Sequence, residues 1–384
     1  MLQCQKDKFS LPDGLHYLNT AYMSPLPKDT EEEGVRLLKR KNDPSQIKAE
    51  DFFNSSNALR KEFGKLVGVT NYQQIAIVPS VSYGIANAAN NIELSPHDEI
   101  VLTAEQFPSN VYVWMEKAKT SGAKVITVDA PDSIDNRAKK WNERILDAIG
   151  DKTKVVTMAH VHWTDGTLFD LEVISKRVKE VGGYLIIDGT QSIGALPFDV
   201  GRVKPDALIC AGYKWLLGPY GIGLGYYSER FNHGKPIEHS WMTRLESENF
   251  AELVNYQDLY QPGAIRYDVG EQSNFITVGM LLESLKAINQ WKPEHIQSYA
   301  QSLTTEYLKE LNDLGFKTES PEWRGHHLIG IRFEENIDPK ALAERMDQRN
   351  IKVSVRGSAV RVAVNVFNTG ADLEALNMCL REAI

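Results

Sequence analysis

Short apolar segments alternate with amphipathic ones between about residues 58 and 228. The apolar segments are predicted to be strands: QIAIVP, EIVLTA, KVITVD, KVVTMAHV, YLIID, ALICAG and GIGLGYY. Several of them are continuous apolar runs, which is typical of strands that helices cover on both faces. Helical patterns occupy the intervals 57–68, 82–92, 110–122, 142–150 and 171–182. This alternation predicts an α/β domain built on a largely parallel sheet.

Residues 229–270 break the pattern, because they are polar, rich in aromatic side chains and poorly periodic. Such a long irregular stretch in a compact protein is usually functional or mobile. Helices at 275–291 and 295–315 are predicted next, the second with a buried stripe at helical spacing. The stripe consists of Ile296, Tyr299, Leu303, Tyr307 and Leu311.

The last part of the chain predicts a smaller unit of mixed structure. Strands are expected at 327–333, 351–355 and 360–367, and helices at 339–350 and 372–384. We therefore predict a large domain over residues 20–270. Residues 271–384 would form a small α+β domain together with the N-terminal segment 1–19.

The composition is that of an ordinary globular protein, with 42% hydrophobic and 24% charged residues. A net charge of -8 gives no basic footprint for nucleic acid or an anionic membrane surface. Cys4, Cys210 and Cys379 are scattered, with no CxxC pair and no metal-like spacing. No segment approaches the ~20 apolar residues of a membrane span, and the N-terminus lacks a signal-peptide core. We expect a cytoplasmic protein without disulfides, metal or membrane contact.

Two charged residues end neighbouring predicted strands, at the edge where open α/β sheets bind ligands. Asp188 closes YLIID, and Lys214 follows ALICAGY. A carboxylate there can keep a pyridine nitrogen protonated, and a lysine desolvated by aromatic neighbours can form an imine. The alternatives are an Asp-Gly turn and a lysine with a buried stem and a solvated amine.

Two further features suit anionic groups. The strand QIAIV runs through PSVSYG into a helix, so backbone N–H groups and a serine hydroxyl lie where phosphate binds. Ordinary serine capping is the alternative.

In AVRVAVNVF the valines share one face, so Arg361 points the other way and offers its planar, two-pronged guanidinium group to a substrate carboxylate. A solvated surface arginine is the alternative there. Pyridoxal 5'-phosphate with an amino acid would use all four features.

The chain resembles the class V aminotransferase family, which includes cysteine desulfurases, kynureninases and isopenicillin N epimerase. The matching segments appear in family order along nearly the whole chain. They are YLNTAYMSPLP, IVPSVSYGIAN, AEQFPSNVYVW, IIDGTQSIGALPFD, CAGYKWLLGPYGIG, DVGEQSNF and VRVAVNVFNT. The resemblance implies fold type I of the pyridoxal-phosphate transferases, with a large, mostly parallel-sheet domain and a small α+β domain.

The resemblance also implies roles around the cofactor ring. Lys214 matches the lysine that carries the cofactor as a Schiff base. Asp188 matches the partner of the pyridine nitrogen, and Gln191 the group near the phenolic oxygen. Phe107 matches the residue stacked on the ring.

For the phosphate, the resemblance implies a cradle from the Val81 amide and the Ser82 hydroxyl, with a further hydroxyl from Tyr213. Gln272 and Ser273 match the loop that a second subunit brings to the phosphate. A homodimer with shared active sites is therefore implied.

For the substrate, Arg361 matches the carboxylate-binding arginine, and Asn19 lies in the N-terminal loop near the substrate. His160, His162 and Asp165 end a predicted strand facing the same site. They are expected either to act on the substrate side chain or in proton transfer, or else to form a turn with a satisfied histidine. We predict a substrate contact for His162.

The chain departs from the cysteine desulfurases in several places. It has Ala211 and Tyr213 before the lysine, where desulfurases have a small residue and a histidine, and Trp163 where they often have an asparagine. The stretch NIKVSVRGSAV before Arg361 is short and lacks the nucleophilic cysteine. Persulfide-forming desulfurase activity is therefore disfavoured.

We expect a pyridoxal-phosphate-dependent enzyme acting on an amino acid, an aminotransferase of class V type. The alternatives are a lyase acting on carbon–sulfur or carbon–selenium bonds and an amino-acid epimerase, because pocket shape decides among these outcomes. A non-catalytic binding module is disfavoured by the intact set of site residues. A nucleotide-binding protein lacks support, since the chain has neither a P-loop nor a G-x-G-x-x-G after a strand.

Overall fold

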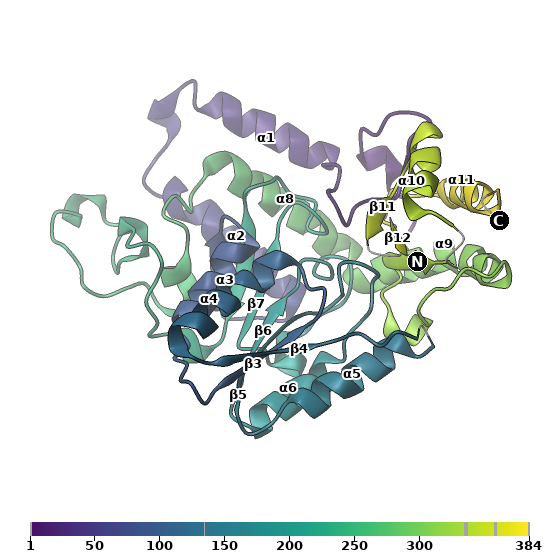
Figure 1. Cartoon of the computed structure of the whole chain (residues 1–384). Helices are drawn as coiled ribbons and strands as arrows, with labels where there is room; N and C mark the ends of the chain where they lie inside the picture. The colour runs from purple at the N-terminus through teal and green to yellow at the C-terminus, as the bar shows by residue number, and fades with distance from the viewer. Residues whose placement is uncertain (1, 134, 334–336, 357–358, 383–384) are drawn as a thin grey trace.

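The computed structural model describes residues 2–133, 135–333, 337–356 and 359–382. Its main strands are β2 Ile75–Val78, β3 Glu99–Thr103, β4 Lys124–Val128, β5 Thr153–Ala159, β6 Tyr184–Asp188, β7 Ala207–Ala211 and β8 Gly223–Tyr227. Within these residues they form one seven-stranded sheet in the order β2-β8-β7-β6-β5-β3-β4 (Figure 1). β8 runs antiparallel to both β2 and β7, whereas the other pairs are parallel. The predicted α/β fold with a mostly parallel sheet is confirmed.

Helices cover both faces of this sheet, so alternate residues of a strand belong to different cores. In β2, Ile75 and Ile77 face one core, and Ala76 and Val78 face the other. The first core is closed by α2 Asp51–Val67, α5 Arg137–Ala148, α6 Leu171–Glu180 and α8 Phe275–Trp291. The second is closed by α3 Val81–Asn90 and α4 Tyr112–Ser121, which lie across the sheet from α5 and α6 in Figure 1. Burial on both faces explains the continuous apolar runs.

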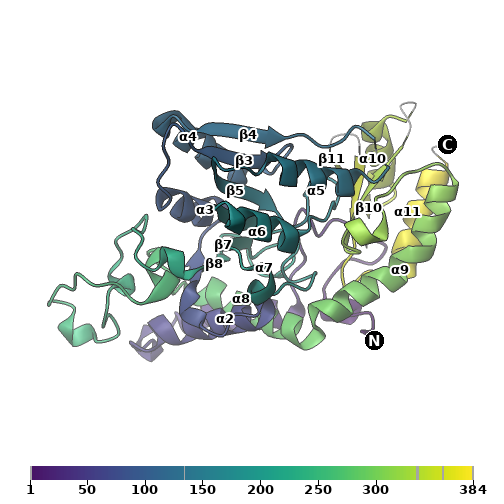
Figure 2. The same cartoon turned by 90° about the horizontal axis from the view of Figure 1, so that it is seen from below.

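A smaller lobe lies at one end of the sheet, at the right in Figures 1 and 2. Its antiparallel sheet contains β9 Leu328–Arg332, β11 Ser354–Arg356 and β12 Ala359–Ala363, with β12 in the middle. Its core also takes side chains from α9 Pro293–Asp313, α10 Pro339–Gln348 and α11 Gly370–Arg381. The N-terminal segment lies here as well, because β1 His16–Tyr17 pairs in parallel with β10 Ile351–Lys352.

The helix α1 Lys28–Arg40 is absent from the predicted elements. Its sequence carries few apolar residues, and only Thr30, Gly34 and Leu37 of it are buried. A Cβ on Gly34 would lie 2.7 Å from Met280 Sδ, and one on Gly279 would lie 2.3 Å from a methyl carbon of Leu37. The two glycines therefore let α1 pack closely on α8, a contact that a search for apolar periodicity misses.

The domain boundary at residue 270 stays a prediction. Beyond it, Val278, Leu281 and Leu285 of α8 join the core of the large sheet, and α8 packs against α1 and α2. In the predicted stripe of α9, Ile296 and Leu311 are buried and the other three side chains are half-buried.

Residues 229–270 contain only short 3-10 turns, as their irregular pattern predicts. Much of this stretch projects from the body of the molecule, at the left in Figure 2.

The short helix α7 Val200–Val203 precedes β7 and completes the helices of the large sheet. Among the described residues, no helix combines the length and apolar character that a membrane crossing requires.

Candidate active site

A cavity of about 270 Å³ opens at the carboxyl ends of the central strands. Its walls come from the turns that follow β2, β3, β5, β6 and β7. Most of the residues predicted to bind a cofactor line it, namely Val81, Ser82, Phe107, Asp188, Gln191, Tyr213 and Lys214. The sheet therefore gathers side chains that are up to 133 positions apart (214 − 81) in the sequence.

The amine of Lys214 is desolvated within this cavity. Only 7% of the residue is exposed, and its Nζ lies 5.3 Å from the ring centre of Phe107 and 5.6 Å from that of Tyr213. Burial lowers the pKa of Lys214 to about 8; Asp188 opposes this shift, and Arg361 and Arg356 add to it. A lysine with this pKa is partly neutral near physiological pH, as imine formation requires.

Asp188 is the last residue of β6 and is buried beside the lysine. Its Oδ1 accepts a hydrogen bond of 2.9 Å from the Thr190 amide. Burial raises the pKa of Asp188, against the lowering effects of Thr190 and Lys214. A buried carboxylate at this position suits a protonated ring nitrogen as its partner.

The N-terminus of α3 forms another wall of the cavity. Ser80 caps the helix, since its Oγ accepts a 3.2 Å hydrogen bond from the Tyr83 amide and lies 2.9 Å from Ser82 Oγ. The amides of Val81 and Ser82 are in the first turn, where α-helix geometry provides no acceptor within the helix. Amides, hydroxyls and the helix dipole together suit an anion such as phosphate.

Gln191 and Phe107 both line the cavity, but hydrogen bonds hold the side chain of Gln191, whereas that of Phe107 is partly exposed. Gln191 Nε2 donates to the Ala21 carbonyl at 3.0 Å, and its Oε1 accepts from Trp215 Nε1 at 2.8 Å. Both ends of this amide are held, so its contact with a cofactor oxygen stays a prediction. Phe107 is 37% exposed and meets Trp163 edge to face at 5.4 Å between ring centres. Trp163 itself lines the cavity.

Arg361 lies one layer behind the cavity wall. It is 1% exposed and does not line the cavity, but its Nη1 donates to the Trp163 carbonyl at 2.8 Å. Its Nη2 lies 3.5 Å from Ser354 Oγ, which donates to Asn19 Oδ1 at 2.8 Å. Val360 and Val362 fill the core of the small lobe, so Arg361 occupies the opposite face of β12, as the alternation predicts.

The sequence profile of the aminotransferase class-V family matches residues 43–379. The chain belongs to this family. A probable cysteine desulfurase of Pyrococcus abyssi is 30% identical over 330 residues, which cover 82% of this chain and 79% of that protein. An uncharacterised aminotransferase of Bacillus subtilis is 25% identical over 316 residues, covering 82% and 80%. A solved complex of a cystine C–S lyase with cysteine persulfide superimposes with a TM-score of 0.85 at 17% identity, covering 97% of this chain and 98% of that one.

In this class V protein, His162 lies in the core and not in the cavity. It is fully buried, its Nδ1 lies 2.8 Å from Thr164 Oγ1, and its Nε2 lies 3.3 Å from the Ala104 carbonyl. The substrate contact predicted for His162 thus has no support in this geometry. His160 lines a separate groove of about 800 Å³. Asp165 pairs with Arg137 at 2.8 Å and with Arg332 at 2.5 Å.

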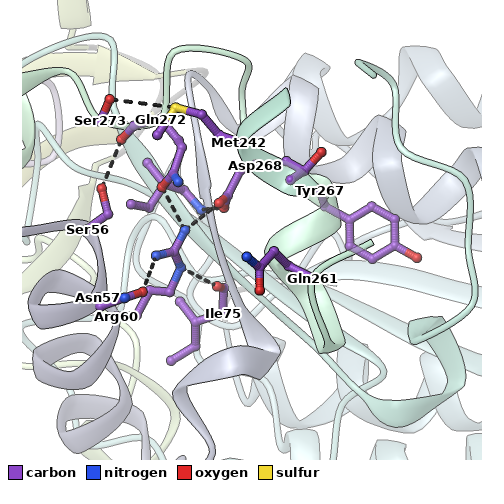
Figure 3. A network of polar contacts seen from close by, with 12 residues as sticks. Ser56, Asn57, Arg60, Ile75, Met242, Gln261, Tyr267, Asp268, Gln272 and Ser273 are labelled. Atoms are coloured by element: carbon purple, nitrogen blue, oxygen red, sulfur yellow. Dashed lines mark hydrogen bonds and ion pairs between the residues drawn. The ribbon is translucent and has the colours of Figure 1, made fainter. Parts of the chain in front are cut away.

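Gln272 and Ser273 do not line the cavity of their own chain. They belong to a polar network shown in Figure 3. Arg60 forms a fully buried ion pair with Asp268 and donates to Gln272 Oε1 at 2.8 Å. Ser273 Oγ lies 3.7 Å from Met242 Sδ. The network anchors the end of the 229–270 segment, and a role for Gln272 and Ser273 toward a second subunit stays a prediction.

None of the three cysteines, all of which lie in the described part of the chain, lines the cavity. Cys210 and Cys379 are buried, and burial raises the pKa of both thiols. Cys4 is exposed and lies 3.8 Å from the carbonyl oxygens of Phe367 and Asn368. The structure thus offers no thiolate to attack a substrate in this cavity.

Two residues, Trp163 and Arg356, were not assigned to the site from the sequence. Trp163 appeared only as a departure from the desulfurase pattern, yet its ring forms part of the wall. Arg356 lies with its guanidinium carbon 5.5 Å from the centre of that ring. The signal was present in the spacing of the two arginines, since antiparallel pairing of 354–356 with 359–361 puts both on one face.

Proposed function

We propose that this class V protein binds pyridoxal 5'-phosphate in the Lys214 cavity, with the amine of Lys214 as its covalent attachment. The residues present fit this group. A buried carboxylate, Asp188, suits its pyridine nitrogen, and the first turn of α3 suits its phosphate. The observation that carries the proposal is the desolvated amine of Lys214, whose pKa is lowered to about 8 beside that carboxylate.

The reaction proposed is elimination from an amino acid that bears sulfur or selenium on Cβ. When bound, pyridoxal phosphate supplies an electron sink for negative charge at Cα. Asp188 keeps the proton on the pyridine nitrogen, and Arg361 binds the substrate carboxylate. Lys214 Nζ takes the Cα proton, and the Cβ–S bond breaks with its electron pair leaving on sulfur. Hydrolysis of the remaining three-carbon unit yields pyruvate and ammonia.

The lack of a cysteine at the cavity supports elimination over persulfide transfer, because elimination needs no protein thiol. The likeness to a cystine C–S lyase agrees with this choice at the level of the fold. An aminotransferase is the second candidate, supported by the family's name and by the Bacillus subtilis relative.

The test begins with the visible spectrum of purified protein saturated with pyridoxal phosphate. The band of the lysine-bound cofactor is expected in the wild type and in Lys309→Ala, a change at an exposed lysine of α9, and is expected to be lost in Lys214→Ala. Absence of the band in the wild type refutes the proposal.

Products then separate the two candidates. With L-cysteine and S-substituted cysteines, pyruvate and free sulfide or thiol are expected in equal amounts. A lasting conversion to the pyridoxamine form, reversed by a keto acid, would instead establish an aminotransferase.

We also propose a homodimer in which Gln272 and Ser273 of each chain face the phosphate site of the other. The sharing of sites rests on the family resemblance of DVGEQSNF and on the position of both residues outside their own cavity. Light scattering after gel filtration tests the assembly. A monomer at the concentrations that support activity refutes it.

A further inference from the structure

The hairpin of the small lobe presents two arginines on one face. In the β11–β12 ladder, Ser354 pairs with Arg361, and Arg356 pairs with Ala359. Residues two apart in a strand share a face, and directly paired residues share it as well. Arg356 and Arg361 are therefore diagonal neighbours, a separation of roughly 7–8 Å that long side chains readily bridge. Their face is opposite to Val360 and Val362, which fill the core of the lobe.

Both guanidinium groups meet Trp163, which forms part of the Lys214 cavity wall. Arg361 donates to its carbonyl at 2.8 Å, and Arg356 lies over its ring at 5.5 Å. Both arginines also lower the pKa of Lys214, so their positive charges act on the reacting amine. The two cations thus lie behind the same part of the cavity wall, the one that Trp163 forms.

Neither arginine is neutralised within the part of the chain that the structure describes. The Nε atoms of both are buried and have no hydrogen-bond partner there. Arg356 donates from Nη1 only to its neighbour's carbonyl, at Val355, with a distance of 2.7 Å. The side chain acting on the pKa of Arg356 is Tyr22, and those acting on the pKa of Arg361 are Arg356 and Tyr17, so no carboxylate is among them. A buried cation beside a half-buried one, with no anion between them, is costly, and a ligand that brings two anionic groups removes this cost.

We infer that the substrate is an amino acid whose side chain ends in a second acidic group, with Arg361 binding the α-carboxylate and Arg356 the distal acid. The inference rests on the proposed function, since it assigns the α-carboxylate to Arg361. One arginine suffices for an amino acid with a neutral side chain. The second, on the same face and against the same tryptophan, makes the site selective for dianionic substrates.

Two S-substituted cysteines of nearly equal shape test this selectivity. S-Carboxymethyl-L-cysteine carries the second acid, and S-carbamoylmethyl-L-cysteine carries an amide in its place. The measurement is the concentration of each that half-saturates the change in cofactor absorbance of the holoenzyme. At least tenfold tighter binding of the acid is expected, which corresponds to about 1.4 kcal/mol.

In Arg356→Gln the acid-to-amide preference is expected to fall to about threefold or less, and Arg356→Lys is expected to retain part of it. The matched control is Arg349→Gln, which removes a partly exposed arginine that pairs with Glu382. It is expected to keep the wild-type preference. Circular dichroism and retention of the cofactor band confirm that each variant is folded.

Equal affinity of the wild type for acid and amide overturns the inference, and so does an undiminished preference in folded Arg356→Gln. These outcomes leave the proposed function intact if pyruvate still forms from both compounds. Binding with the predicted preference but without pyruvate supports the inference and overturns elimination. Absence of any cofactor band overturns both.

Discussion

The titration of the Lys214 amine decides how readily the apoprotein reacts with pyridoxal phosphate. Its pKa is lowered to about 8, whereas an ordinary lysine titrates near about 10.4. At pH 7 about one-tenth of the amine is then neutral, roughly 230 times the neutral fraction of an ordinary lysine. The shift corresponds to about 3 kcal/mol in favour of the neutral form.

The rate of imine formation is expected to rise with pH and to level off above the pKa of Lys214. The sign follows from the chemistry, because only the neutral amine attacks the aldehyde. Arg361 lowers this pKa, so Arg361→Gln is expected to move the midpoint of the profile upward. Asp188 raises it, so Asp188→Asn is expected to move the midpoint downward.

Stopped-flow absorbance with excess pyridoxal phosphate, at pH values from below 7 to about 10.5, measures the profile. Arg349→Gln serves as the control, since its side chain pairs with Glu382 at the rim of the small lobe. A wild-type midpoint near that of free lysine would refute the reasoning. Shifts of the same sign in Arg361→Gln and Asp188→Asn would refute the assigned charge effects.

Three further predictions concern the frame of the site. Asp165→Asn removes the carboxylate that pairs with buried Arg137, so urea unfolding is expected to show a loss of about 3–5 kcal/mol. An unchanged midpoint would contradict the ion-pair account. Phe63→Ala empties a fully buried position of α2, for which the same assay is expected to give about 3–5 kcal/mol. Gly166→Ala places a Cβ 2.1 Å from the Leu328 carbonyl oxygen at a positive φ, whereas Gly182→Ala has a positive φ and open space. Thermal unfolding is therefore expected to show a larger loss for Gly166→Ala, and equal losses would argue against the steric conflict.

The sequence was sufficient to predict the strands of the large sheet and the position of the reactive lysine. A continuous apolar run between helical patterns is explained by burial on both faces, a local signal that needs no tertiary information. Asp188 and Lys214 each follow such a run, so the general placement of ligands at the carboxyl edge already brings them together. Helix α1 was missed because close packing through Gly34 and Gly279 replaces the broad apolar stripe that a pattern search requires.

The orientation of the side chains that follow the strand ends was decided by the tertiary structure. Ala159, Val161 and Trp163 face the cavity, while His160 and His162 point elsewhere, so alternation continues past the end of β5. The sequence placed these residues near the site but did not say which of them turn toward it.

What the sequence by itself determined is therefore the family, the α/β framework and the pair Asp188 and Lys214, because strand periodicity and motif order are local properties of the chain. Only the tertiary structure decided the surroundings of that pair. It brought Arg356 of β11 against Trp163 in the turn after β5 and gave Gln272 its partner Arg60, 212 positions away (272 − 60). Contacts of this kind depend on how separately formed elements dock, and no local pattern records that geometry.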